Sequence, residues 1–165
     1  MISIHIPCEH CGSDLVVNAG QSISNRRLVW YRSYSCPDCG FQLEEDGFDS
    51  PPDEIRRVIL ADEGEWTLSV HETGSRAILT LKVLRKALNL SLDDVAKLRK
   101  HIPGSVCDGT RVEMEWLRIL LSSEQLQASV VSGEVGSQSK FGGVTAVGWE
   151  QSVTGDGCDL PLPRG

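Results

Sequence analysis

The sequence predicts an α+β protein in which a small zinc-ribbon β domain is followed by a compact α+β sandwich. Two Cys-x-x-Cys-Gly turns, at residues 8–12 and 36–40, predict the first unit. Three helical patterns enclosed by two strand patterns predict the second, in the order strand, helix, helix, helix, strand. The expected organisation is a zinc ribbon at residues 1–49, a linker with a short helix at 50–65, the α+β domain at 66–131, and a largely disordered tail rich in Gly and Ser at 132–165.

The two turns supply four candidate ligands for one metal ion. These are Cys8, Cys11, Cys36 and Cys39. Closed sites of four thiolates are commonly structural zinc sites, and the glycine after each second cysteine lets backbone amides turn toward the sulfurs. We therefore predict one structural zinc ion. Iron is the alternative, because the Cys-Pro-x-Cys-Gly turn resembles that of rubredoxin, whereas disulfides are disfavoured because nothing in the sequence marks an oxidising compartment.

The ribbon segment alternates short extended runs with turns. Strands are expected at residues 2–6, 15–17, 28–34 and 41–44. A segment of this size cannot hold a large apolar core, so metal binding is expected to supply much of its folding free energy. His5 and His10 lie beside the first turn, but four cysteines already complete a zinc shell. Trp30 is expected to pack in the sheet, with stacking on single-stranded nucleic acid or a peptide as the alternative.

In the linker, residues that end the preceding strand pattern are followed by a short predicted helix. Pro51 and Pro52 suit the first turn of that helix. Ile55, Val58 and Ile59 recur on one side and are expected to pack on one of the two domains. A separate binding motif is the alternative use of this helix.

Hydrophobic periodicity places the elements of the second unit. Residues 66–70 alternate as a strand, and residues 126–131 close the unit as another. The first helix opens at Gly74, Ser91 caps the second, and a capping box at Thr110 starts the third. The expected inner faces of the three helices are Ile78, Leu81, Leu84 and Leu88, then Leu92, Val95, Leu98 and Ile102, then Val112, Trp116, Ile119 and Leu120.

Motifs in these helices resemble those of a known family. Leu-Lys-Val-Leu-Arg at residues 81–85 matches an apolar-Lys-x-apolar-Arg motif, and Asn-Leu-Ser-Leu at 89–92 echoes a Gly-Leu-Gly-Leu link. A proline, an Asp-Gly turn and a third helix follow in the same order. On these motifs, residues 66–131 resemble the C-terminal domain of the bacterial ribosomal stalk protein of the large subunit. The resemblance implies that fold, and it implies that Lys82 and Arg85 line a basic face that binds protein, as the family's first two helices recruit translational GTPases.

A second protein offers a looser analogy. The N-degron adaptor of the Clp protease has a similar fold, in which the acidic Glu72 after the first strand could meet an amino terminus.

A group of basic side chains forms the candidate partner-binding surface. Its members are Arg76, Lys82, Arg85, Lys86 and Lys97. Three of them are spaced three and four residues apart, which puts them on one side of the first helix. We expect this face to dock an acidic partner protein. The alternative is a solvated face with ion pairs such as Asp93 with Lys97.

Composition narrows the class of protein. The net charge of −7 and the pI near 5.1 argue against a general nucleic-acid binder, whose phosphate contacts need a basic face. No apolar run is long enough for a bilayer span, and the first residues do not have the pattern of a signal peptide, so we expect a cytoplasmic protein. A reducing cytoplasm agrees with Cys107 and Cys158 as unpaired thiols.

The sequence carries no recognisable catalytic motif. It has no glycine-rich phosphate loop, no Gly-x-Ser-x-Gly elbow and no His-Glu-x-x-His helix. His71, Glu72 and His101 would serve acid–base catalysis only if they met in a pocket, and Cys107 lacks the local sequence context of a nucleophile. We therefore expect a protein that is not an enzyme.

The expected function is that of an adaptor, or of a specific binding or inhibitory partner, that binds another protein through the basic first helix. The alternative is a translation-associated factor that contacts the ribosome or translational GTPases. A small hydrolase or redox protein that uses Cys107 or an iron-loaded ribbon is a third hypothesis. The tail contains one apolar patch, residues 141–149, which could dock on the protein itself or on a partner.

Overall fold

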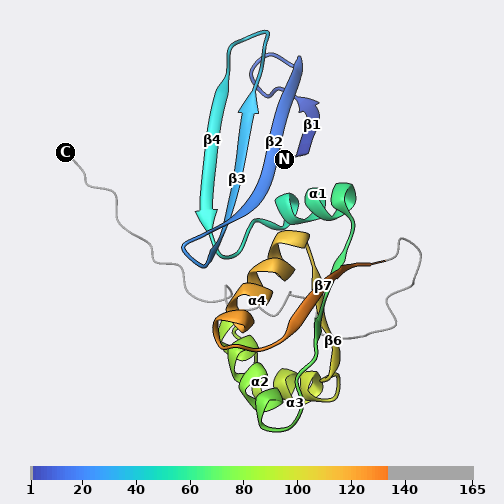
Figure 1. Cartoon of the computed structure of the whole chain (residues 1–165). Helices are drawn as coiled ribbons and strands as arrows, with labels where there is room; N and C mark the ends of the chain where they lie inside the picture. The colour runs from blue at the N-terminus through green and yellow to red at the C-terminus, as the bar shows by residue number, and fades with distance from the viewer. Residues whose placement is uncertain (1, 134–165) are drawn as a thin grey trace, which may run out of the picture.

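A computed structural model describes residues 2–133 of the chain, which form two packed units, each built on its own antiparallel sheet (Figure 1). The predicted α+β class is confirmed. The described elements are β1 (Ile2–Pro7), β2 (Asp14–Ser24), β3 (Arg27–Ser35), β4 (Gln42–Phe48), α1 (Asp53–Glu63), β5 (Trp66–Val70), α2 (Gly74–Leu88), α3 (Leu92–Arg99), β6 (Gly104–Gly109), α4 (Arg111–Ser123) and β7 (Ala128–Ser132).

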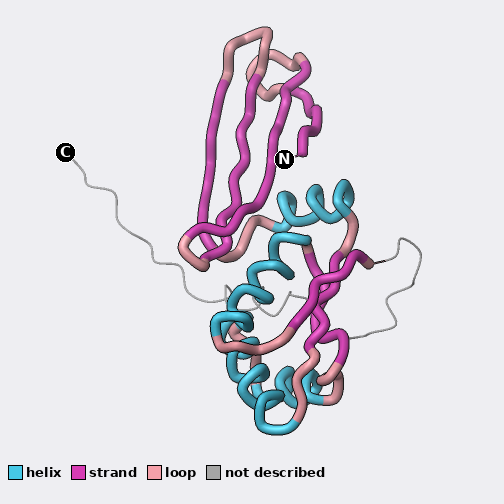
Figure 2. The backbone as a smooth tube through the Cα atoms, in the orientation of Figure 1, coloured by secondary structure: helices cyan, strands magenta, loops and turns pink. Residues whose placement is uncertain are grey.

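The first unit is a meander of four strands in the order β1-β2-β3-β4. All four strands fall where the sequence predicts them, but β2 extends well beyond the expected residues 15–17. Residues 18–24 continue the strand because they pair with β3, in a register that runs from Val16 opposite Ser35 to Ser24 opposite Arg27. The long hairpin of β2 and β3 therefore extends to the second unit (Figure 2).

Helix α1 lies against the first sheet. Ile55 and Ile59 are buried in a small cluster with Ile2 of β1 and Ala19 of β2, and Val58 packs at its edge. Trp30 is partly buried against the same cluster, which agrees with its expected packing role. The linker helix thus completes the hydrophobic core of the ribbon sheet.

The second unit has a three-stranded sheet in the order β6-β5-β7, and the helices cover one of its faces (Figure 1). Its core is the larger of the two, with thirteen buried residues drawn from the sheet, α2, α3, α4, the turn between α2 and α3, and the turn before β7. The expected order of elements omitted β6, which pairs with β5 from Gly109 opposite Trp66 to Gly104 opposite Val70. The chain therefore runs strand, helix, helix, strand, helix, strand.

Two of the expected inner positions on α2 and α3 are wrong. Ile78 is 65% exposed and Leu92 is 69% exposed. Helix α2 instead buries Thr80, Leu81, Leu84 and Leu88, and α3 buries Leu98. Both misplaced residues lie in the first turn or two of their helix, where the chain enters from solvent before the core is reached.

Helix α4 turns a different face to the core from the expected one. It buries Glu113, Met114, Leu117 and Leu121, while the predicted inner residues Val112, Trp116, Ile119 and Leu120 are only partly buried. The helix is apolar on two adjacent faces, and periodicity alone selected the wrong one. The second face looks toward the junction of the two units, where the Trp116 indole N–H donates a hydrogen bond to the carbonyl of Arg26.

Candidate metal centre

Two turns of the same construction carry the four cysteines. In the first, between β1 and β2, the Cys8 amide donates to the carbonyl of Ser13, and the Gly12 amide donates to that of Cys8. In the second, between β3 and β4, Cys36 and Gly40 repeat the pattern, with Phe41 in place of Ser13. Gly12 and Gly40 have φ angles of +76° and +74°, in the left-handed region that glycine adopts at low cost. The sequence therefore folds locally into two matching knuckles.

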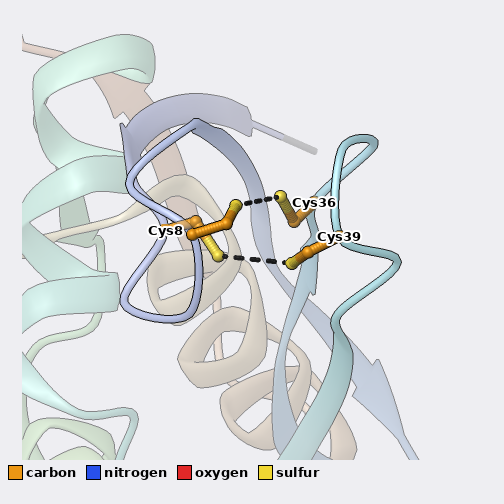
Figure 3. Close-up of side chains that lie close together, drawn as sticks. Cys8, Cys36 and Cys39 are labelled. Atoms are coloured by element: carbon orange, nitrogen blue, oxygen red, sulfur yellow. Dashed lines mark hydrogen bonds between the residues drawn. The ribbon is translucent and has the colours of Figure 1, made fainter.

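The knuckles bring all four thiols together. The sulfur atoms of Cys8, Cys11, Cys36 and Cys39 lie within 4.8 Å of one another. The Cys8 and Cys39 sulfurs are 3.8 Å apart, and the Cys11 and Cys36 sulfurs are 3.6 Å apart (Figure 3). All four are free thiols, so no disulfide accounts for the proximity.

This donor set fits a tetrahedral metal ion. Zinc–sulfur bonds of about 2.3 Å at tetrahedral angles place two sulfurs about 3.8 Å apart, which matches the two sulfur pairs. Each knuckle contributes one buried cysteine, Cys8 or Cys36 at 2% exposure, and one exposed cysteine, Cys11 or Cys39. The centre could hold a metal ion such as zinc at the edge of the sheet, with its outer side toward solvent.

Apolar packing supports the centre from the sheet side. Cys8 and Cys36 are buried in one cluster with Leu15 and Val17 of β2, and Ile4, Tyr34 and Phe41 pack against it. The His10 ring stacks at a tilt on the ring of Phe41, with 4.4 Å between the centroids. The two buried sulfurs are therefore fixed by packing as well as by hydrogen bonds.

The two histidines beside the first knuckle do not belong to the sulfur cluster. The Nδ1 atom of His5 lies 2.5 Å from a carboxylate oxygen of Asp14, and His10 faces Phe41. Four sulfurs would complete the ligand shell of a tetrahedral ion and leave no open position of the kind that a catalytic zinc keeps for water.

The two exposed thiols have pKa values that are shifted in opposite directions. The backbone N–H and the hydroxyl of Ser13 lower the pKa of Cys11 to about 7. The backbone N–H of Phe41 acts in the same direction on Cys39, but desolvation and the neighbouring thiols outweigh it and raise the pKa of Cys39 to about 12. A divalent ion would replace the protons that the metal-free cluster retains, because only thiolates ligate. The role of Ser13 was not predicted, although its place directly after the knuckle glycine could have indicated it.

The structure places the predicted partner-binding residues in different local environments. On α2, Arg76 pairs with Glu72, with 2.7 Å between Nε and Oε2, and Arg85 donates to the carbonyl of Leu90. On α3, Lys97 lies 3.6 Å from Asp94 rather than from the expected Asp93. Within residues 2–133, Lys82 and Lys86 are exposed and make no ion pair. The role of the five residues in binding a partner stays a prediction.

The candidate catalytic side chains are held in structural contacts. Cys107 is buried, burial raises its pKa, and its thiol contacts the sulfur of Met114 at 3.8 Å. Glu72 accepts hydrogen bonds from Arg76 and from the backbone of Gln127, and His71 contacts the hydroxyl of Ser129. Cys158 and the apolar patch at 141–149 lie outside the described residues.

Comparison with known proteins identifies no relative. No family model matches the chain, and neither a curated protein nor a solved structure resembles it significantly. Among residues 2–133, no helix is both long and apolar enough to cross a bilayer. The four-cysteine centre is thus the feature of the structure that bears most directly on function.

Proposed function

We propose that the protein is a zinc-binding interaction module that does not act as an enzyme. One zinc ion would hold the two knuckles together and so fix the free end of the ribbon sheet. The observation that carries this proposal is the convergence of four sulfurs at tetrahedral spacing. Zinc is favoured over iron because a closed four-sulfur site of two knuckles is commonly a structural zinc site.

Metal analysis of the purified protein tests this proposal. The wild-type chain should contain about one zinc per chain, and Cys36→Ser should lose most of it. Cys107→Ser is the matched control, because Cys107 is also a buried cysteine but lies in the core of the second unit. Absence of bound metal in wild type would overturn the proposal, and visible absorption with bound iron would reassign the ion.

We further propose that α2 presents the surface that binds an acidic partner protein. Lys82 and Lys86 lie one turn apart on α2, and the side chains of Ile78 and Leu79 are 65% and 37% exposed in the preceding turn. Exposed apolar side chains beside unpaired cations are typical of a docking surface. The chain would then act as an adaptor, or as a specific binding or inhibitory partner.

Charge reversal tests this surface. Lys82→Glu combined with Lys86→Glu should abolish a specific interaction without lowering thermal stability, because neither lysine makes an ion pair within the described residues. Arg99→Glu combined with Lys100→Glu makes the same change of charge at the end of α3 and should leave the interaction intact. Binding that survives the α2 reversal would contradict the proposal, and ribosome co-sedimentation lost only in that variant would assign the partner to the translation machinery.

A further inference from the structure

An apolar groove runs between α2, α4 and the lower end of the ribbon sheet. Its volume is about 610 Å³, and its apolar lining includes Leu28, Val83, Ala87, Trp116, Leu117 and Leu120. Exposed charged side chains also line it. Arg26 and Lys86 are positively charged, and Asp49 and Glu124 are negatively charged. The groove follows the second apolar face of α4, which no described element covers fully.

The chain leaves the described structure beside the start of α4, the helix that forms one wall of the groove. Ser132 pairs with Trp66 across β5 and β7, and the Gly133 amide donates to the carbonyl of Glu65 at 2.8 Å. The guanidinium of Arg111, the first residue of α4, lies 5.1 Å from the Trp66 ring centroid. The exit point is therefore beside the start of α4, next to a separate pocket that Trp66 and Arg111 line. The groove begins on another side of the same helical turn, at Glu113 and Met114.

The remaining chain is long enough to extend along α4. Helix α4 has 13 residues, which corresponds to a length of about 20 Å. The eight residues from 134 to 141 can span up to about 26 Å when extended. Residue 141 can therefore reach either end of α4.

One segment of that remaining chain matches the lining of the groove. Residues 141–149 form the longest uncharged run after residue 133 and contain both of the aromatic residues there, Phe141 and Trp149. Lys140 and Glu150 flank the run, and they are complementary to the charges of both signs at the groove edges. An uncharged segment with an aromatic residue at each end suits an apolar groove with a polar rim.

We propose that residues 141–149 bind in the groove between α2 and α4 of their own chain. A short tether gives a segment an effective concentration on the order of 1 mM. An intrinsic dissociation constant on the order of 0.1 mM would then keep the segment docked about nine-tenths of the time. Docking would cover Trp116 and Leu120 and would bring the segment beside Lys86, at the edge of the proposed partner surface.

Amide NMR spectra of the full-length protein test the proposal. Phe141→Ser combined with Trp149→Ser should shift the amide signals of Val83, Ala87 and Leu120 and leave those of the metal knuckles unchanged. Leu160→Ser combined with Leu162→Ser is the matched control and should leave the groove signals in place. Neither pair alters a described residue, so a folding defect would not confuse the result. Groove signals that match wild type in the first variant would overturn the proposal.

Hydrogen exchange gives the complementary measurement. Amides of residues 141–149 should exchange about tenfold more slowly in wild type than in the Ala87→Glu variant, because a buried carboxylate would block the groove. Ile78→Glu, on an exposed position of the same helix, should retain the slow exchange. Protection that is absent in wild type, or that disappears on dilution and so comes from a second copy, would overturn the proposal.

Discussion

The guanidinium of Arg56 forms a bidentate ion pair with the carboxylate of Glu113, with Nε 2.9 Å from Oε1 and Nη2 3.1 Å from Oε2. Arg56 belongs to α1, which completes the ribbon core, and Glu113 belongs to the first turn of α4. Gln21 of β2 joins the same network through Glu113 and Thr110. The network therefore couples the two units through side chains that are largely shielded from water, with Glu113 only 2% exposed.

Removal of Arg56 should destabilise the whole protein. Arg56→Ala leaves a buried carboxylate without its partner, which costs about 3–5 kcal/mol of unfolding free energy. Arg57→Ala is the matched control, since this exposed neighbour on α1 donates a hydrogen bond to the carbonyl of Asp53 and makes no ion pair within residues 2–133. It should cost within about 0.5 kcal/mol. Urea unfolding measures both variants, and equal losses would show that the ion pair does not couple the units.

Metal removal should unfold the ribbon and spare the second unit. The two ribbon clusters have four buried residues each, whereas the core of the second unit has thirteen, so the ribbon depends more on its metal. A strong chelator should therefore raise amide exchange across residues 2–48 well before it does so across 66–132. Hydrogen exchange with mass-spectrometric detection resolves the two segments. Uniform exchange in both segments would contradict a metal-dependent ribbon.

The features that the sequence predicted correctly are those determined by a few adjacent residues. Both Cys-x-x-Cys-Gly turns form knuckles, and the predicted cap at Ser91 and the predicted capping box at Thr110 are both present. The side chains of Ser91 and Thr110 accept hydrogen bonds from the amides of Asp94 and Glu113. Local hydrogen bonds and a left-handed glycine fix these structures without help from the rest of the chain. The metal centre could therefore be predicted almost completely.

The features that were missed depend on distant parts of the chain. Strand β6, with the sequence Gly-Ser-Val-Cys-Asp-Gly, shows no clear alternation and is held by pairing with β5, some forty residues earlier in the chain. The inner face of α4 is chosen by the elements that surround it, because Met114 and Leu117 lie on one apolar face and Trp116 and Leu120 on the next. The groove follows from the same choice and could not be predicted from periodicity.

A side chain at position 47 should strain the ribbon sheet. Gly47 lies opposite Trp30 across β3 and β4, and a Cβ atom at Gly47 would come within 2.6 Å of Cζ2 of the indole ring. Gly47→Ala should therefore cost about 1–3 kcal/mol, because the indole must shift within its packed cluster. In a Trp30→Leu background the same change should cost less than about 0.5 kcal/mol. A double-mutant cycle by urea unfolding measures this coupling, and additive costs would show that the indole is not the obstacle.

Acid should remove the stabilisation that Glu72 provides. The Arg76 guanidinium, with help from the Gln127 amide, holds the pKa of the Glu72 carboxyl below its ordinary value of 4.5. Because the folded pKa is depressed, the stabilisation is complete above the unfolded pKa and is lost as the pH falls through the folded value. The difference in unfolding free energy between wild type and Glu72→Gln should thus be largest above pH 5 and should shrink steadily below about pH 4.5. Arg76→Ala removes the main cause of the pKa shift and should therefore weaken the same pH dependence. If the curves of unfolding free energy against pH were parallel for wild type and Glu72→Gln from pH 7 to pH 3, the assigned role of this ion pair would be contradicted.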